Sequence, residues 1–520
     1  MTGENKQATE GRTDEETALK DAAGSAARPA GAARAKASGP GSAANGAEST
    51  KITRMGSGSI PKLVAEFAIP SVCGMLVNGA YNVISSIFLG QAMGELGLSV
   101  ATAANPTMII FMALSMLVGM GGNSLCALRL GEGRHDKAEQ TLGNTVTLSL
   151  FIWVLVFFLA MCPPIINALL TISSATDSVR PFAQTYIRIL AAGFIFQCIG
   201  AGVNNFIRTA GAPNRALVTM IVGAVSCAAF NFLYVMVLGW GVPGSAFATI
   251  CGQAVSCATV LWYFLKTKDA PLKLRLDAMR PDGRTIGKIL SLGLASFAVQ
   301  VAAAVVNFVV NYVLVTYGSQ SSIGAENALA CMGVVQRLAM FAVLPVIGTA
   351  AAIQPLLGFN YGARLIGRVR TTLKWGVGVA TVLAFLFWAV LHMFPQQVVA
   401  LFGITDAGLL AFTTKALTVW MIMLPFVGFQ VVCSNYFQAT GQPFKSTVLS
   451  LTRQVIFLIP ALLILPEAIP HLMPGMEGID GVYFATPVAD FAAIFTTAVV
   501  MIPELKRLKK IERGEIEVKY

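Results

Sequence analysis

Long apolar runs constrain the fold of this chain more than any other feature. Stretches such as Phe151–Cys162, Ala216–Leu238 and Val377–Leu391 recur between about residue 60 and residue 502. As a helix, a run of about 20 apolar residues crosses the roughly 30 Å hydrocarbon core of a bilayer. Only 12% of the residues are charged, against about a quarter in soluble domains. The sequence therefore predicts an all-α membrane protein.

The loops between the runs indicate how many times the chain crosses the membrane. Basic residues gather in the loops after even-numbered spans, most densely between Lys266 and Lys288, and the other loops are mainly acidic. Because cytoplasmic loops carry the excess of Lys and Arg, this alternation places both termini in the cytoplasm. We expect twelve spans at 62–89, 100–128, 141–162, 183–207, 215–238, 244–265, 286–317, 325–357, 372–394, 411–437, 446–465 and 482–502.

The two halves of the chain repeat. Asn205–Pro213 parallels Asn435–Pro443, and Arg129-Leu130-Gly131 parallels Asn360-Tyr361-Gly362, both at an offset of about 230 residues. Six spans per copy give both copies one orientation, related about the membrane normal. This predicts two pseudo-symmetric six-helix lobes with a central cleft. The expected parts are a disordered cytoplasmic tail (1–55), an N-terminal lobe (56–265), a cytoplasmic loop (266–287), a C-terminal lobe (288–503) and a basic cytoplasmic tail (504–520).

Polar neutral residues within the spans are candidates for a substrate cavity. On the first span they are spaced four and three apart, and on the seventh span seven and four apart, so each row lies on one helix face. Buried amides without partners are costly, so such rows should face a wet cleft or one another. Taken singly, each residue also fits hydrogen bonding between helices. The candidates are Asn78, Asn82, Ser85, Gln197, Asn205, Asn231, Gln300, Asn307 and Asn311.

A few charged residues and one proline are candidates for coupling and gating. Arg337 and Asp490 both lie well inside spans of the C-terminal lobe, where a charge costs about 2.5–3.5 kcal/mol. We hypothesise that they pair, directly or through water, and that protonation of Asp490 changes the pairing; a static structural bridge is the alternative. Glu66, near the cytoplasmic face, is a second candidate proton acceptor. Pro70 removes a hydrogen bond from the first span and is the candidate gate.

The remaining composition argues against other classes of partner. The net charge of +11 fits basic cytoplasmic loops better than a nucleic-acid surface. The nine Cys stand singly in apolar segments and the three His are far apart, which argues against a metal site. No cofactor or obligatory protein partner is implied, and the bilayer and small organic substrates are the expected partners.

The motifs, taken in order, resemble those of the multidrug and toxic compound extrusion (MATE) family, particularly its bacterial drug-efflux branch. They include Ile69-Pro70, Tyr81-Asn82, Gly119–Gly122, Arg129-Leu130-Gly131, Asn205–Arg208, Gly239–Val242, Gln354-Pro355, Gly358–Ala363, Arg453-Gln454 and the Pro487…Asp490 pair. The resemblance implies a multi-pass transporter of the bacterial inner membrane that exchanges H⁺ or Na⁺ for organic compounds. The family's acidic positions in the first and fifth spans fall here on Ser85 and Asn231, which are neutral, so the coupling ion stays open.

The residues leave three alternatives to an ion-coupled antiporter. A lipid-linked precursor flippase would carry several cationic residues facing the cavity, which the N-terminal spans lack. An uncoupled facilitator is suggested by the neutral Ser85 and Asn231. A membrane enzyme would need a metal cluster, a carboxylate pair or a nucleophile–base pair within the spans, and the sequence presents none. We therefore expect a transporter and not an enzyme.

Overall fold

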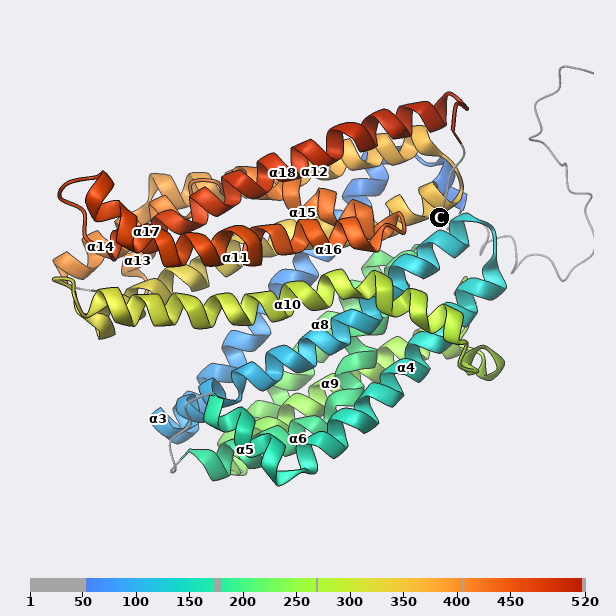
Figure 1. Cartoon of the computed structure of the whole chain (residues 1–520). Coiled ribbons are helices and arrows are strands. Elements are labelled where there is room, and N and C mark those ends of the chain that lie inside the picture. The colour runs from blue at the N-terminus through green and yellow to red at the C-terminus, as the bar shows by residue number, and fades with distance from the viewer. Residues whose placement is uncertain (1–52, 173–178, 268–269, 405, 517–520) are drawn as a thin grey trace, which may run out of the picture. The chain divides into compact units, whose positions relative to one another are not determined.

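The computed structural model describes residues 53–172, 179–267, 270–404 and 406–516, and within these ranges the chain is helical without a strand. Short π-helical turns interrupt three of the spans, at Cys198–Val203, Phe232–Val237 and Thr452–Leu458, and a 3₁₀ turn lies at Leu276–Met279. The α-helices (Figure 1) are α3 (Ile60–Gly131), α4 (His135–Met161), α5 (Pro163–Ile172), α6 (Arg180–Gln197), α7 (Asn204–Thr209), α8 (Pro213–Asn231), α9 (Gly241–Lys266), α10 (Gly283–Gly318), α11 (Ala325–Gly362), α12 (Ile366–Met393), α13 (Pro395–Ala400), α14 (Ala407–Trp420), α15 (Leu424–Ala439), α16 (Pro443–Leu451), α17 (Ile459–Leu472) and α18 (Asp480–Glu512).

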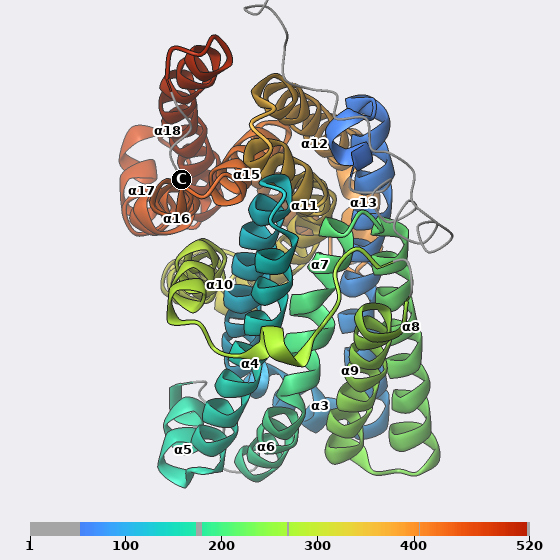
Figure 2. The ribbon, with the colours of Figure 1, turned by 90° about the vertical axis from the view of Figure 1, so that its right-hand side faces the viewer.

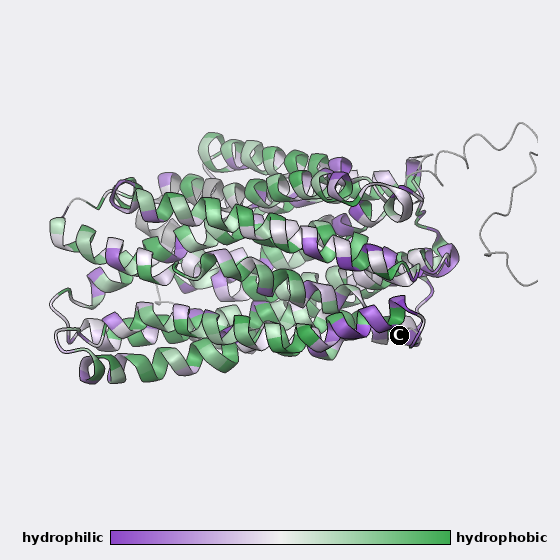
Figure 3. Cartoon of the chain, turned by 90° about the horizontal axis from the view of Figure 1, so that it is seen from above, coloured by the Kyte–Doolittle hydropathy of each residue, from purple (hydrophilic) through white to green (hydrophobic). Residues whose placement is uncertain are grey.

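The helices confirm the predicted set of membrane spans. Eleven described helices are long and apolar enough to cross a bilayer, and the pair α14 and α15, bent by 43°, brings the number to twelve. Two of the spans, Ile60–Ala80 and Ser99–Gly131, lie within α3, where the backbone leaves the helical region at Gly94 with φ 56° and ψ −138°. Apolar residues dominate the middle of the helices, and hydrophilic ones gather toward the end where the C-terminus lies (Figure 3).

The spans assemble as the two predicted lobes. Helices α3 to α9 form the N-terminal lobe and α10 to α18 form the C-terminal lobe, with α3, α10 and α11 between them (Figure 2). The first span of α3 packs against α11, and its second span packs against α10. The all-α, two-lobe fold class predicted from the sequence is confirmed.

One end of the bundle carries most of the basic side chains. It includes Arg129, Lys137, Lys288, Arg368 and Lys445, and we refer to it as the basic end. The opposite end, where α4 meets α5 and α10 is followed by α11, is called the far end. These two names describe the bundle without assuming which side faces the cell interior.

Glycines from the repeated motifs lie where the lobes touch near the basic end. A Cβ on Gly131 would lie 2.0 Å from the carbonyl oxygen of Phe359, and one on Gly362 would lie 2.2 Å from that of Leu128. Because Gly131 and Gly362 occupy the same position in the two copies of the repeat, each lobe presents its glycine to the other lobe's backbone. The helices approach here more closely than any larger residue would permit.

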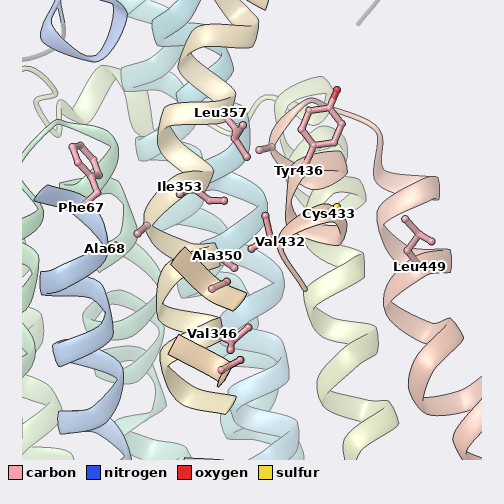
Figure 4. Close-up of a cluster of buried hydrophobic side chains, with 14 of the residues drawn as sticks. Phe67, Ala68, Val346, Ala350, Ile353, Leu357, Val432, Cys433, Tyr436 and Leu449 are labelled. Carbon is pink, nitrogen blue, oxygen red and sulfur yellow. The ribbon is translucent and has the colours of Figure 1, made fainter. Parts of the chain in front are cut away.

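A shared apolar core joins the lobes over the same region. Figure 4 shows Phe67 and Ala68 of α3 on one side of α11, and Val432 and Tyr436 of α15 on its other side. Ile353 of α11, between them, is fully buried. Helix α11 thus belongs by sequence to the C-terminal lobe but packs against helices of both lobes.

A short segment before α3 reaches across to the C-terminal lobe. Arg368 at the start of α12 donates hydrogen bonds to the carbonyl oxygens of Met55 (3.1 Å) and Gly58 (2.8 Å). Asn360 of α11 also donates to the Met55 carbonyl, at 3.2 Å, and Met55 is buried. We call residues 53–58 the clasp, because they lead directly into the first span yet bind the opposite lobe.

The loop between the lobes is held against α4 and ends in a helix cap. Asn144 accepts a hydrogen bond from the backbone N–H of Asp282 at 2.8 Å, and the Asp282 carboxylate accepts from the backbone N–H groups of Arg284 and Thr285. The Thr285 hydroxyl also donates to this carboxylate, at 2.6 Å. That hydroxyl, with the two backbone N–H groups and nearby Arg129, holds the pKa of Asp282 below its usual value, against an opposing effect of desolvation.

We predict that Gly293→Ala destabilises the contact between the lobes. A Cβ at Gly293 would lie 1.7 Å from the carbonyl oxygen of Leu117, so the helices must separate, and overpacking of this kind costs about 1–3 kcal/mol. The unfolding midpoint of the purified protein should fall. Gly287→Ala, in the same helix and with no atom within 4 Å of the added Cβ, is the matched control. An equal midpoint for the two variants would contradict the close contact.

We predict that Asp282→Ala weakens the start of α10, as loss of a helix N-cap does. Asp282→Asn, which keeps a capping oxygen, should lower the unfolding midpoint clearly less than Asp282→Ala does. Because the carboxylate's pKa is lowered by folding, its contribution to stability is present at neutral pH and is lost as the pH falls through that lowered pKa. Thermal unfolding at pH 7 compares the two variants, and equal midpoints would show that the cap contributes nothing.

Candidate functional site: a crevice between the lobes

The faces that the two lobes present to each other are buried near the basic end and exposed toward the far end. On α10, Ile289 and Gly293 are buried against the second span of α3. Farther along the same face, Gln300 is half-buried, and Asn307 and Asn311 are exposed. These positions share one face because they recur at intervals of four, seven, seven and four residues.

Helix α11 shows the same gradient. Gly348 is buried against Val72 of the first span, and Leu344 and Phe341 lie beside Gly79. One more turn toward the far end, on the same face, Arg337 is exposed. The side of α11 that contacts the N-terminal lobe in its middle is therefore uncovered beyond Phe341.

The opposing helix surfaces follow the same pattern. On the first span Ser71 is buried and Asn78, seven residues on, is exposed. On the second span Ser124 is buried at the lobe contact, whereas Ile110, fourteen residues toward the far end, is 41% exposed. From these contacts and exposures we infer a crevice between the four faces that opens to the far end. We call it the crevice.

The crevice contains some of the amides singled out in the sequence. Gln300, Asn307 and Asn311 lie on its α10 wall, and Asn78 lies on the first-span wall. The side-chain nitrogen of Asn307 also donates to the carbonyl oxygen of Ala303, at 3.0 Å. The side chains of Asn82 and Ser85 lie outside the described part of the structure.

The other predicted cavity residues lie inside the N-terminal lobe. Asn231 is fully buried and donates to the carbonyl oxygen of Cys227 at 3.0 Å. Asn205 is also buried, and its side-chain oxygen accepts a hydrogen bond from Arg208 at 2.9 Å. Gln197 is half-buried, and its backbone carbonyl accepts from Ser115. The structure thus separates these three residues from the amide row of α10.

The predicted ion pair between Arg337 and Asp490 is wrong. Asp490 of α18 accepts instead from Arg453, at 2.6 Å from the Nε atom and 3.4 Å from a terminal nitrogen. The Asp490 side chain is only 4% exposed and that of Arg453 is 23% exposed. Arg453 lies in the π-helical turn Thr452–Leu458, a feature often found at functional sites. Asp490 faces this neighbouring span within its own lobe, whereas Arg337 faces the other lobe.

The remaining predicted residues lie apart from this pair. Glu66 forms an ion pair with Arg54 at 3.1 Å, and both side chains are more than a third exposed. Pro70 is buried inside the first span of α3, which continues as a helix through it. Its role as a gate stays a prediction.

A buried polar network that sequence reasoning missed closes the crevice toward the basic end. Gln354 of α11 donates to Ser124 of α3 at 2.8 Å and to Gln438 of α15 at 3.4 Å. Gln438 donates in turn to the Leu292 carbonyl and to Ser296 on α10, at 2.8 and 3.0 Å. One sequence signal pointed to it: Gln438 takes the place of Arg208 in the repeat, so this position is polar in both copies.

Two further features concern ions and solvent. Within the described ranges, no group of three or more His, Cys, Asp or Glu side chains is arranged to hold a metal ion. A cavity of about 220 Å³ lies at the basic end, lined in part by Arg129, Glu132 and Lys288. Its lining residues differ from those of the crevice.

Comparison with known proteins identifies the family. The family model described as MatE matches residues 70–233 and 295–463, well over half of the chain. A curated relative, "Multidrug export protein MepA" of Staphylococcus haemolyticus (strain JCSC1435), is 24% identical over 464 residues, which cover 88% of this chain and 97% of that protein.

Solved structures agree with this match. The structure of the MATE multidrug transporter DinF-BH is 34% identical, with a TM-score of 0.77 over 86% of this chain and 96% of that one. Another, described as an outward-facing conformation of a multidrug resistance MATE family transporter of the MOP superfamily, is 24% identical, with a TM-score of 0.79 and coverage of 87% and 97%. The chain is therefore a multi-pass membrane transporter that belongs to the MATE family.

Proposed function

We propose that this protein exports small organic compounds by ion-coupled antiport with alternating access. The single observation that carries the proposal is the crevice, whose walls touch near the basic end and are exposed toward the far end. A transporter of this kind exposes one central site to each side of the membrane in turn. The contacts between the lobes correspond to the closed side of that cycle.

The distribution of basic residues supplies the orientation. Because Lys and Arg are retained in cytoplasmic loops, we assign the basic end to the cytoplasm. The crevice then opens to the cell exterior, in the state from which an exported compound is released. The relatives support organic compounds as the exported class, since MepA is named a multidrug export protein and DinF-BH a multidrug transporter.

The Arg453–Asp490 pair supports coupling to an ion. Arg453 lies ten residues after Pro443 and Asp490 ten residues after Asp480, so each is roughly 15 Å along its span from the respective helix end. A carboxylate that is almost fully buried at this depth persists because Arg453 neutralises it. Proton or Na⁺ binding at Asp490 competes with Arg453, and the π-helical turn that carries Arg453 provides the local backbone freedom for it to move.

We predict that export is driven by an ion gradient. Purified protein reconstituted in vesicles should accumulate or release a fluorescent organic compound faster under an imposed H⁺ or Na⁺ gradient than without one. Imposing each gradient separately identifies the coupling ion. Movement at one rate under both gradients and under neither would replace antiport with uncoupled facilitation.

We predict that Asp490→Asn destabilises the protein and removes the response to the gradient. Removing one partner leaves Arg453 unpaired, and breaking a buried pair costs about 3–5 kcal/mol. The double variant Asp490→Asn with Arg453→Gln should recover part of the unfolding midpoint but not the gradient response.

The control for this prediction is Lys415→Gln. Lys415 pairs with Asp480 at 3.3 Å, but its side chain is 49% exposed, so its loss should cost no more than about 1 kcal/mol. A gradient response that survives Asp490→Asn would reduce the Arg453–Asp490 pair to a structural bridge.

A further inference from the structure

Arg337 is a cation on the crevice wall without a carboxylate beside it. It is exposed, and among the described residues it forms no ion pair. Its place in the crevice follows from the helix register, because Phe341, Leu344 and Gly348 lie four, seven and eleven residues further along the same face. All three positions adjoin the first span of α3.

The walls around Arg337 are almost uncharged. In the described parts of the segments that line the crevice, residues 71–80, 99–121, 296–318 and 325–348, the only charged residue besides Arg337 is Glu326. Glu326 is in the first turn of α11, eleven residues from Arg337, which corresponds to roughly 16 Å along the helix. The inner part of the crevice therefore carries a single positive charge.

Hydrogen-bonding groups lie at a similar depth. Arg337 is twelve residues from Ala325 at the far end of α11, and Asn307 is eleven residues from Gly318 at the far end of the adjacent α10. At 1.5 Å per residue both are roughly 17 Å from the far end. The guanidinium supplies several donors in a fixed plane that suits a carboxylate, sulfonate or phosphate group. The amides at this depth provide neutral donors and acceptors.

We propose that the crevice selects small organic anions, or compounds with an anionic group, through Arg337. An uncompensated cation in a largely apolar crevice raises the local concentration of anions and disfavours cations. The inference deepens the proposed export function by naming a class of exported compound. It rests on that proposal where it treats the bound compound as the cargo. Its binding step does not depend on which ion drives transport.

The test compares two dyes that share a xanthene ring and differ in charge, anionic fluorescein and cationic rhodamine 6G. Binding to the full-length protein in nanodiscs of zwitterionic lipid is measured by fluorescence anisotropy at pH 8, with empty nanodiscs as the background. We expect fluorescein to bind at least about tenfold more tightly than rhodamine 6G, as one charge-assisted contact allows. Tighter binding of rhodamine 6G would overturn the proposal.

Variants identify the residue. Arg337→Gln should weaken fluorescein binding by about tenfold or more, and Arg337→Lys should retain part of the affinity. Arg188→Gln is the matched control, because Arg188 is eight residues into α6, which packs against α3, α4 and α9 within the N-terminal lobe. Equal losses in Arg337→Gln and Arg188→Gln, or no loss in Arg337→Gln, would overturn the assignment.

Two further measurements distinguish a soluble cargo from a lipid headgroup, and binding from export. Anionic phosphatidylglycerol in the nanodiscs should leave fluorescein binding unchanged; competition would assign Arg337 to a lipid headgroup and overturn a soluble cargo. In vesicles, transport of rhodamine 6G that is unaffected by Arg337→Gln would contradict this inference but still support the export proposal. Arg337-dependent binding of fluorescein without transport of either dye would instead contradict the export proposal, and the assignment of the anion-binding site would stand.

Discussion

The structure depends on close backbone contact between the lobes at the basic end. Apolar side chains gain little by leaving lipid for one another, so helices associate in a membrane through tight packing and hydrogen bonds. Gly131 and Gly362 supply the packing from the two copies of the repeat. Gln354, Ser124 and Gln438 supply buried hydrogen bonds at the same seam. Elsewhere the inner faces of the lobes diverge, and the crevice exists because this adhesion is confined to one end.

Because the lobes touch at one end only, the polar residues at the two ends of their interface have different roles. Those at the seam are buried and hydrogen-bonded to one another, so they help to hold the lobes together at the basic end. Those toward the far end, such as Asn307, Asn311 and Arg337, are exposed and accessible to a solute. The Arg453–Asp490 pair belongs to neither group, because it lies between two spans of the C-terminal lobe. If an ion binds at Asp490, its effect can reach the seam only through the packing of α15 and α18 against α11 and α12.

The spans, their number and the two-lobe arrangement could be predicted from the sequence. The length of the apolar runs and the charge of the loops indicate where the chain crosses the membrane, and the repeat indicates two lobes of one orientation. Rotation about each helix axis is not encoded so directly. Arg337 and Asp490 have compatible depths, yet they point to different neighbours, so the predicted pair failed. The amide row of α10 was predictable as one face since its spacing fixes the rotation among its members. Asn205 and Asn231 belong to no such row, and only the packing of the N-terminal lobe reveals that they are internal.

The clasp has a mechanical consequence for any opening at the basic end. Met55 and Gly58 are tethered to Arg368, so the beginning of the first span is bound to the C-terminal lobe, although the span itself belongs to the N-terminal lobe. The lobes therefore cannot part there as two independent rigid bodies. Either the tether is released, or the first span flexes between its anchored beginning and its middle, and Pro70 lies in that interval. If the clasp stays bound while the basic end opens, the first span must therefore bend between the clasp and the middle of the span.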